Sequence, residues 1–285
     1  MFQTLRKYAS LVKFPHTVFA MPFALIGYFY GIQSAGFEGW LLLKVLLCMV
    51  FARNAAMGFN RWADRDIDAI NPRTAAREIP RGIISPKNAL WFVSVNALLF
   101  ILVAAWINRL CLILSPVALA VILGYSLTKR FSWLCHLFLG LSLAIAPSGA
   151  YIALTGTLTQ IPVILSVLVF FWSAGFDIIY SLQDLEFDRE NNLNSMPARL
   201  GAAGALAVSA ALHLLTALLS IWLVFAFGNG VWIRIGTMIF IALLVYQHVI
   251  VSPGKLDRIN MAFSTLNGIA SITYAAFIIL GFYIG

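Results

Sequence analysis

Two short segments hold nearly all the acidic residues of this 285-residue chain, and their spacing could build a metal site. Of its eleven Asp and Glu residues, only Glu38 and Asp257 lie elsewhere. The first segment carries Asp64, Asp66, Asp68 and Glu78, and the second carries Asp177, Asp184, Glu186, Asp188 and Glu190. Carboxylate oxygens are ligands that Mg²⁺ prefers, so we expect the two segments to bind Mg²⁺ together.

Within each segment, several oxygen-bearing side chains are spaced to share one helix face. The intervals are four and four for Asn60, Asp64 and Asp68, and seven and four for Asp177, Asp184 and Asp188. Side chains four residues apart stack on a helix, whereas Asp66 points away. Such acids among arginines are also typical of a solvated, ion-paired surface. Two such sets in a chain with only 11% charged residues favour the metal site.

Basic residues surround the same segments. Those near the first segment and at the end of a later apolar run are Arg61, Arg65, Arg73, Arg77, Arg81, Lys129 and Arg130. Carboxylates, Mg²⁺ and clustered Arg and Lys side chains together are how proteins hold a diphosphate. Tyr125 lies four residues before Lys129, so a hydroxyl and an ammonium project from one helix end. The alternative for these cations is the ordinary excess of Lys and Arg in cytoplasmic loops.

Arg53 differs from these cations because it falls within an apolar run. It lies seven residues before Asn60, hence on the same helix face and about two turns deeper. An intramembrane arginine is costly and faces a cavity or a partner. Its planar fork matches a carboxylate, so we interpret Arg53 as an anchor for an acidic co-substrate. The alternative is a structural pair with one of the aspartates.

The elements that position these residues are membrane helices. The chain is 61% hydrophobic, and a spanning helix needs about 20 apolar residues. Nine runs meet this length: 16–34, 39–59, 87–107, 110–128, 133–154, 161–183, 203–226, 231–251 and 260–283. We therefore expect an all-α polytopic membrane protein. Residues 1–285 form one domain in this prediction, with polar caps at 60–86 and 184–202.

The scattered histidines and cysteines form no recognisable site. They are His16, His136, His213 and His248, with Cys48, Cys111 and Cys135. No spacing resembles a zinc site, a redox pair or a catalytic triad. We interpret the histidines as hydrogen-bonded helix residues and the cysteines as apolar filling.

The distribution of Lys and Arg predicts the orientation. Fifteen of 19 lie on one set of loops and three, Lys44, Arg109 and Arg234, on the other. The rule that cytoplasmic loops are positive places the N-terminus and the charged mouth in the cytoplasm. With nine spans, the C-terminus lies on the opposite side. We expect a prokaryotic inner membrane location and the lipid bilayer, not nucleic acid, as the surrounding partner.

Three motifs in this sequence resemble those of one family. NRWADRDIDAINPRT, beginning at Asn60, is similar to the NxxxDxxxD motif of the UbiA superfamily of intramembrane aromatic prenyltransferases. DIIYSLQDLEFDRENNLNSMPARLG, beginning at Asp177, resembles its DxxxD-containing second motif. Tyr125 and Lys129 match its YxxxK element. The order and spacing agree over the whole chain, and the phrase around Asp68 is most similar to the 4-hydroxybenzoate polyprenyltransferase branch.

The resemblance implies nine helices around a central cavity with cytoplasmic caps. It implies Mg²⁺-dependent transfer of a polyprenyl group from polyprenyl diphosphate to a ring carbon of an aromatic acid, hydroxybenzoate- or hydroxynaphthoate-like, in ubiquinone or menaquinone synthesis. By resemblance, the metal and diphosphate positions are Asn60, Asp64, Asp68, Asp184 and Asp188. The other matching positions are Arg73, Tyr125 and Lys129 for diphosphate, Arg53 for the aromatic acid, and Asp177 as a further polar position. Arg77 is a further substrate-binding candidate from the first cap.

Three alternatives remain. The first is a prenyltransferase of the same superfamily with another acceptor. The second, a CDP-alcohol phosphotransferase, uses clustered aspartates, but its Asp-Gly-x-x-Ala-Arg start is missing. The third is an ion-coupled transporter, which would place ionisable residues near the bilayer midplane rather than at one membrane face.

Overall fold

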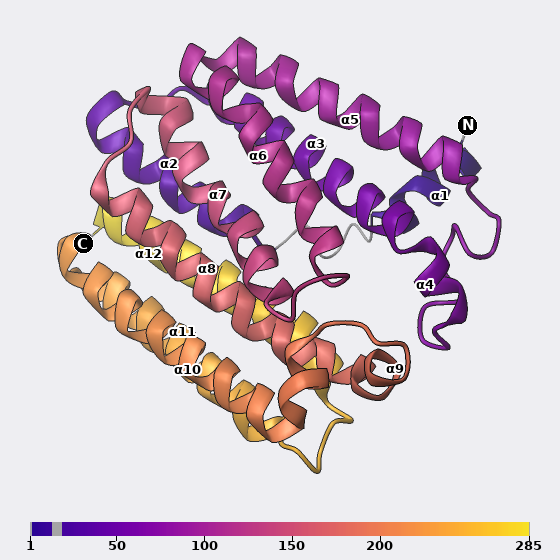
Figure 1. Ribbon diagram of the computed structural model, residues 1–285. Helices are drawn as coiled ribbons and strands as arrows, with labels where there is room; N and C mark the ends of the chain where they lie inside the picture. The colour runs from indigo at the N-terminus through magenta and orange to yellow at the C-terminus, as the bar shows by residue number, and fades with distance from the viewer. Residues whose placement is uncertain (1, 13–18, 285) are drawn as a thin grey trace.

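The computed structural model describes residues 2–12 and 19–284, which form a bundle of antiparallel helices (Figure 1). The first half contains α1 (Phe2–Leu11), α2 (Met21–Ala35), α3 (Gly39–Ala63), α4 (Arg65–Ile70), α5 (Pro86–Ile107) and α6 (Arg109–Thr128). The second half contains α7 (Cys135–Thr155), α8 (Gln160–Ser181), α9 (Leu185–Glu190), α10 (Met196–Ala226), α11 (Val231–Ile250) and α12 (Asn267–Ile284). The described residues contain no strand, only an isolated bridge between Ser252 and Lys255. The prediction of an all-α membrane protein is confirmed.

Eight segments of the described chain are long and apolar enough to cross a membrane, one fewer than the nine predicted. The difference lies at the predicted span 16–34, whose first three residues, His16 included, are outside the described residues. The described helix there, α2, has 15 residues, about 22 Å at ~1.5 Å per residue, against a hydrocarbon thickness of ~30 Å. It still lies inside the bundle, packed against α7 and α12.

The other predicted spans end within a few residues of the observed helices, with one larger correction. Helix α10 begins at Met196, so the last part of the predicted cap 184–202 is helical. Ser195 accepts a hydrogen bond from the Ala198 amide and caps this start. The helix is broken at Gly201, which has a φ of 71° that side-chain-bearing residues rarely adopt. The second cap therefore consists of α9, a short turn and the kinked start of α10.

The outward faces of the long helices are apolar, as a lipid-facing surface requires. Trp91 on α5 is 72% exposed, and Phe225 on α10 and Val249 on α11 are each 68% exposed. Large exposed apolar residues of this kind continue along α5 and α10. Such area is too extensive for a protein surrounded by water, so the chain is an integral membrane protein.

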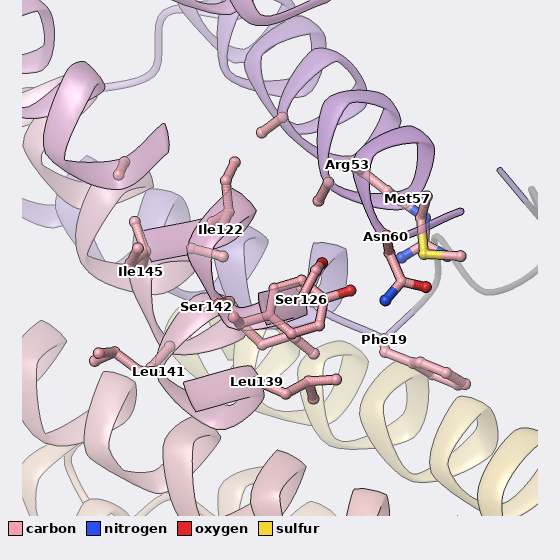
Figure 2. Close-up of a pocket in the computed structure, with 18 of the residues that line it drawn as sticks. Phe19, Arg53, Met57, Asn60, Ile122, Ser126, Leu139, Leu141, Ser142 and Ile145 are labelled. Atoms are coloured by element: carbon pink, nitrogen blue, oxygen red, sulfur yellow. The ribbon is translucent and has the colours of Figure 1, made fainter. Parts of the chain in front are cut away.

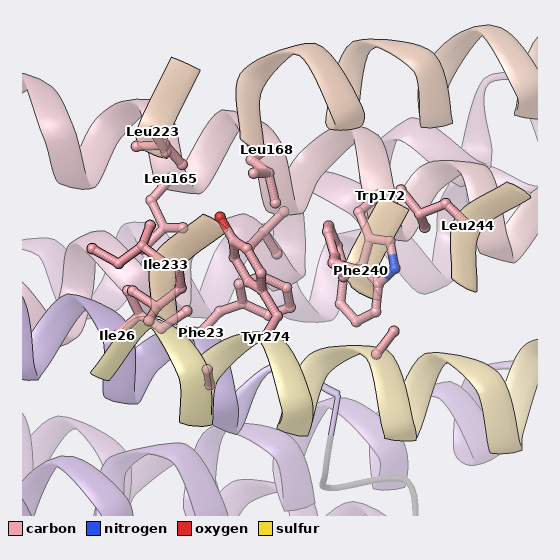
Figure 3. Close-up of a cluster of buried hydrophobic side chains, with 14 of the residues drawn as sticks. Phe23, Ile26, Leu165, Leu168, Trp172, Leu223, Ile233, Phe240, Leu244 and Tyr274 are labelled. Atoms are coloured by element: carbon pink, nitrogen blue, oxygen red, sulfur yellow. The ribbon is translucent and has the colours of Figure 1, made fainter. Parts of the chain in front are cut away.

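Aromatic side chains hold together the half of the bundle formed by α2, α8, α10, α11 and α12 (Figure 3). Phe23 packs against Trp172 with ring centroids 4.9 Å apart, and Phe240 stacks on Tyr274 at 4.6 Å. Asn267 accepts hydrogen bonds from the Trp172 indole and the Gln247 amide, at 3.0 and 2.9 Å. This buried polar contact fixes α8 and α11 against α12 without leaving the Asn267 side-chain oxygen unpaired.

The α2–α7 contact is close because of one glycine. A Cβ added to Gly27 would lie 2.2 Å from the carbonyl oxygen of Pro147. Small residues let membrane helices approach closely, and Gly27 has this role here.

The polar and apolar ends of the bundle are distinct. Helices α1, α4 and α9 lie together at one end, while the last turn of α12 lies at the other (Figure 1). Tyr283, near that last turn, contacts Phe29 in the second half of α2. At the polar end α1 packs on the first cap and the start of α5, where Tyr8 stacks on Phe92 of α5 at 4.9 Å. The polar end contains both acidic segments.

Candidate active site

One large cavity of about 1010 Å³ runs from the polar end into the bundle. Helices α3, α6, α7 and α8 form most of its wall, with Phe19 just before α2 at its edge. In Figure 2, Arg53 and Asn60 project from one helix, and Ser126 and Leu139 lie across the space. Its deeper walls are apolar. They include Met49, Ile107, Leu143, Ile145 and Phe170. The cavity thus joins a charged mouth to a hydrophobic interior.

Each of four aspartates at the mouth is paired with its own cation. The pairs are Asp64 with Arg130, Asp68 with Arg77, Asp184 with Arg73, and Asp188 with Lys129. All four aspartates belong to the sets predicted from helical spacing. The pairing neutralises the charge that four clustered carboxylates would otherwise place in a partly buried mouth.

Arg73 and Asp184 join the two acidic segments directly. Arg73 Nε donates to Oδ1 of Asp184 at 2.9 Å, and its Nη2 pairs with Oδ2 of the same carboxylate. Asn71 adds a donor at 3.0 Å, and Arg73 Nη1 donates to the Tyr180 hydroxyl at 3.0 Å. Burial opposes the charged guanidinium, but the Asp184 hydrogen bonds outweigh it and raise the pKa of Arg73. The bidentate pair therefore clamps the first cap to the end of α8.

The pairs of Asp68 and Asp188 are the most buried of the four. Arg77 Nη1 lies 2.6 and 2.7 Å from the two Asp68 oxygens, and Asp68 is 4% exposed. Lys129 Nζ lies 2.6 Å from Oδ1 of Asp188, which is fully buried. Asp188 lies behind the cavity wall, while Lys129 lines the cavity itself. Every other predicted site residue borders the cavity.

Asp64 sits where α3 ends and α4 begins. Arg130 Nη2 pairs with its Oδ1 at 3.1 Å and also donates to the Ala63 carbonyl at 2.7 Å. The Asn60 amide donates to Oδ2 of Asp64 at 3.3 Å. Burial raises the pKa of the Asp64 carboxyl, an effect that Arg130 offsets in part.

Neither acidic segment is one continuous helix, and of the residues predicted to share a face all but Asp188 line the cavity. The first is interrupted at Asp64, and the second passes through a 3₁₀ turn, Leu182–Asp184, before α9. Asp66 points away from the site as predicted: its side chain is 83% exposed and its ion-pair partner is the neighbouring Arg65. The breaks turn successive carboxylates into the mouth.

Two arginines at the cavity have no hydrogen-bond or ion-pair partner among the described residues. Arg53 lies deep on α3, and its Nε is buried without a hydrogen bond. Arg61 is 4% exposed, its Nε is likewise unpaired, and it borders both the main cavity and a smaller pocket of about 230 Å³. The alternative of a structural Arg53–aspartate pair is therefore wrong. A buried guanidinium without a partner is a site for an anion.

Deeper in the cavity, Asp177 pairs with a histidine rather than with Arg or Lys. His136 Nδ1 lies 2.7 Å from Oδ2 of Asp177. The Tyr125 hydroxyl has Asp177, Asp64 and Arg53 as its charged neighbours. The polar lining thus reaches from the mouth inward along α3 and α8.

The donor set fits a divalent metal held jointly with substrate phosphates. Asp64, Asp68 and Asp184 line one mouth, and all are hard oxygen ligands. Among the described residues, no three His, Cys, Asp or Glu side chains converge on one point. Mg²⁺ commonly binds through one or two carboxylates plus phosphate oxygens, so this separation suits it.

Sequence reasoning missed the specific roles of Arg130, Asn71, Tyr180 and His136. The first three act across the fold, on residues that the spacing alone does not place. His136 had a readable signal, because it and Asp177 are ionisable residues inside apolar runs and such residues pair with one another. The other described histidines fit the prediction: His213 Nδ1 lies 2.9 Å from His248 Nε2. Cys48, Cys111 and Cys135 are free and line the cavity.

These features define an integral membrane protein built for an amphiphile, with a hydrophobic chamber and an anion-binding, metal-compatible mouth. The chain belongs to the UbiA prenyltransferase family, whose model matches residues 20–281. It is therefore a prenyltransferase, and the phosphotransferase and transporter alternatives no longer apply.

Similar proteins agree with this membership. An apo UbiA homologue from Aeropyrum pernix K1 is 33% identical, with a TM-score of 0.85 over 93% of this chain and 97% of that one. A UbiA homologue from Archaeoglobus fulgidus bound to GPP and Mg²⁺ shares the fold at 23% identity, with a TM-score of 0.76 over 98% of this chain and all of that one. A 4-hydroxybenzoate octaprenyltransferase from Nitrosomonas eutropha is 26% identical over 242 residues, 84% of this chain and 83% of that protein.

Proposed function

We propose that this prenyltransferase moves a polyprenyl group from polyprenyl diphosphate to a ring carbon of a hydroxybenzoate- or hydroxynaphthoate-like acid in quinone biosynthesis. The observation that carries the proposal is the large cavity of about 1010 Å³, apolar inside and lined at its mouth by paired aspartates and cations. A relative named 4-hydroxybenzoate octaprenyltransferase supports the acceptor class. The solved homologue with GPP and Mg²⁺ supports the donor and the metal.

The mouth residues bind the diphosphate and its metal in this proposal. Asn60, Asp64, Asp68, Asp184 and Asp188 are the metal-binding set. Bound Mg²⁺ supplies charge neutralisation for the leaving diphosphate. The basic residues assigned to the diphosphate oxygens are Arg61, Arg73, Arg77 and Lys129. Because these cations are already held at the mouth, little reorganisation is needed as negative charge builds on the leaving group.

Arg53 anchors the carboxylate of the acceptor in this proposal. Its unpaired guanidinium lies deeper than Asn60 on the same helix, so the acid enters beyond the diphosphate. Tyr125, whose charged neighbours include Asp64 and Arg53, is assigned to the diphosphate. The ring is then held between the anchor and the ionising donor.

The reaction proceeds by ionisation of the allylic carbon–oxygen bond, whose electron pair leaves with the diphosphate. The apolar walls exclude water from the resulting cation. The electron-rich ring carbon ortho to the phenol hydroxyl attacks it and forms the new carbon–carbon bond. Residues such as Ile145 and Phe170 line the path for the remaining prenyl tail.

We further propose that residues 1–285 act as a single domain in a prokaryotic inner membrane, with the N-terminus and mouth in the cytoplasm. The excess of Lys and Arg at the mouth supports this orientation. The last turn of α12, at the opposite end of the bundle from α4, supports an external C-terminus. A reporter enzyme that is active only outside the cytoplasm should therefore be active when it is fused to the C-terminus.

The test of the proposed function is an in vitro panel of aromatic acids against prenyl diphosphates of several lengths, read by mass spectrometry. We expect a ring-prenylated acid and free diphosphate, and neither without divalent metal. If the protein transferred the prenyl group only to an acceptor that is not a hydroxyaromatic acid, it would be a prenyltransferase of the same superfamily with another acceptor. No transfer at all to any of these acids would contradict the proposal.

A further inference from the structure

His136 and Asp177 form a hydrogen-bonded pair inside the bundle, apart from the four aspartate–cation pairs. They come from the neighbouring helices α7 and α8, and Nδ1 of His136 lies 2.7 Å from Oδ2 of Asp177. Both side chains line the main cavity. The imidazole is 3% exposed and the Asp177 side chain 19% exposed. The pair therefore holds a carboxylate at the edge of the substrate space.

The second imidazole nitrogen fixes where the histidine carries its proton. The backbone N–H of Met196, in the first turn of α10, donates to Nε2 of His136 at 3.3 Å. Because Nε2 accepts this hydrogen bond, the hydrogen-bond network assigns the proton to Nδ1, which donates it to Asp177. In this arrangement Nδ1 of His136 donates to Asp177 and Nε2 accepts from the backbone.

The two oxygens of Asp177 are thereby made unequal. Oδ2 is held by His136, whereas none of the described residues donates a hydrogen bond to Oδ1. The four mouth aspartates are each paired with Arg or Lys, whereas the partner of Asp177 is a histidine. Oδ1 of Asp177 is therefore open to a proton from a bound substrate, while Oδ2 keeps the carboxylate in place.

Asp177 also lies in the part of the cavity where the acceptor ring is expected. The charged neighbours of the Tyr125 hydroxyl are Asp177, Asp64 and Arg53, so these three groups surround one region. Under the proposed function, that region lies between the anchor of the acceptor and the diphosphate. A proton released by the ring there can pass to Oδ1 of Asp177, to which none of the described residues donates a hydrogen bond.

We propose that Asp177 is the general base that removes the ring proton, and that His136 is the positioning residue that orients it. This inference rests on the proposed function. After the ring carbon has bonded to the prenyl group, that carbon still carries its hydrogen and the ring is cationic. The C–H bond breaks, its electron pair restores the aromatic ring, and the proton forms an O–H bond with Oδ1 of Asp177.

The test is a kinetic isotope effect with an acceptor deuterated ortho to its hydroxyl, measured in single turnovers by mass spectrometry. In the wild-type protein we expect ionisation to limit the rate and the isotope effect to be near unity. In Asp177→Asn the rate should fall on the order of 10²–10⁴-fold, the usual contribution of a general base, and a primary isotope effect should emerge. Proton removal will then have become the slow step.

His136 variants separate positioning from simple packing. His136→Phe removes the donor, and we expect a rate loss of about 10–100-fold together with a primary isotope effect. His136→Asn keeps an N–H near the Nδ1 position, so its isotope effect should return toward unity. Thermal unfolding and prenyl diphosphate binding are measured for each variant, and only variants that retain both are compared.

Two results would overturn the inference. One is an Asp177→Asn variant that turns over slowly with an isotope effect near unity, since Asp177 would then act before the ring loses its proton. The other is an equal loss of rate in His136→Phe and His136→Asn, with no isotope effect in either variant. Failure of the proposed function is distinct from both, because the wild-type protein itself would then prenylate no aromatic acid.

Discussion

Arg73 reaches across 111 residues of sequence to hold Asp184, with Nε 2.9 Å from Oδ1 and Nη2 paired with Oδ2. The same guanidinium donates to the Tyr180 hydroxyl. One arginine of the first cap therefore sets the position of the second acidic segment. The relative placement of the two proposed metal-binding halves depends on this contact.

Neutralising one mouth aspartate should abolish catalysis without unfolding the protein. We expect Asp64→Asn or Asp68→Asn to lower prenyl transfer by at least about 10²-fold, because metal-assisted stabilisation of the leaving diphosphate is lost. Asp66→Asn is the matched control, since Asp66 lies between them in sequence but is exposed and turned away. Near-normal metal-dependent transfer by Asp64→Asn, or equal loss in Asp66→Asn, would contradict the assignment.

Arg53→Met should weaken acceptor binding selectively. We expect the KM for the aromatic acid to rise about tenfold or more, as loss of a charged hydrogen-bond partner predicts, with the KM for prenyl diphosphate unchanged. The same variant should unfold at a higher temperature, because it removes a buried charge that has no partner. An unchanged acceptor KM would show that Arg53 does not bind the acid.

Arg61→Gln should produce the complementary result. Arg61 is buried at the mouth rather than deep on α3, and it has no ion-pair partner among the described residues. We expect the KM for prenyl diphosphate to rise and that for the aromatic acid to stay constant. If Arg53 and Arg61 variants changed both constants alike, the proposed separation of the two anion sites would be wrong.

Metal binding should weaken as the pH falls, beginning above the ordinary titration range of an aspartate, about pH 3.9. Burial raises the pKa of Asp64, so its carboxylate becomes protonated at a higher pH and ceases to be a ligand. Metal affinity measured against pH should lose part of this dependence in Asp64→Asn. A profile identical to that of the wild-type protein would exclude Asp64 as the titrating ligand.

The raised pKa of Asp64 also determines how the free energy of unfolding changes with pH. The folded state binds its proton more tightly than the unfolded chain, so Asp64 contributes a loss of stability as the pH rises through the interval between the two pKa values. The change in unfolding temperature caused by Asp64→Asn should therefore be more positive at pH 7 than at low pH. The opposite ordering would show that Arg130 dominates over burial.

Gly27→Ala should destabilise the bundle. Its new methyl group would meet the Pro147 carbonyl at 2.2 Å, which forces α2 and α7 apart at a cost of about 1–3 kcal/mol. Gly124→Ala on α6 is the control, because no atom lies within 4 Å of its added Cβ. Thermal unfolding in detergent measures both, and equal stability of the two variants would argue against the close contact.

The helices and the residues of the mouth could be predicted from the sequence, because apolar runs and four-residue spacing are local signals. The predicted span 87–107 and helix α5 differ by one residue. Pairing could not be predicted in the same way. Arg73 is closer in sequence to Asp68 than Arg77 is, yet Arg73 crosses to Asp184, since tertiary packing decides which carboxylate each cation reaches. The break at Gly201 likewise depends on how α10 meets the cap.

In the four aspartate–cation pairs, each charged group of the mouth already has a partner that an incoming ligand must displace. Metal alone would have to displace an arginine or lysine from its carboxylate, and diphosphate alone would have to pull a cation such as Arg73 away from Asp184. When metal and diphosphate bind together, the carboxylates bind the metal and the cations bind the diphosphate. Every charged group then keeps a partner of opposite charge. We therefore expect each ligand to increase the affinity for the other by the same factor, as thermodynamic reciprocity requires. The free protein should bind either ligand alone more weakly than it binds that ligand in the presence of the other.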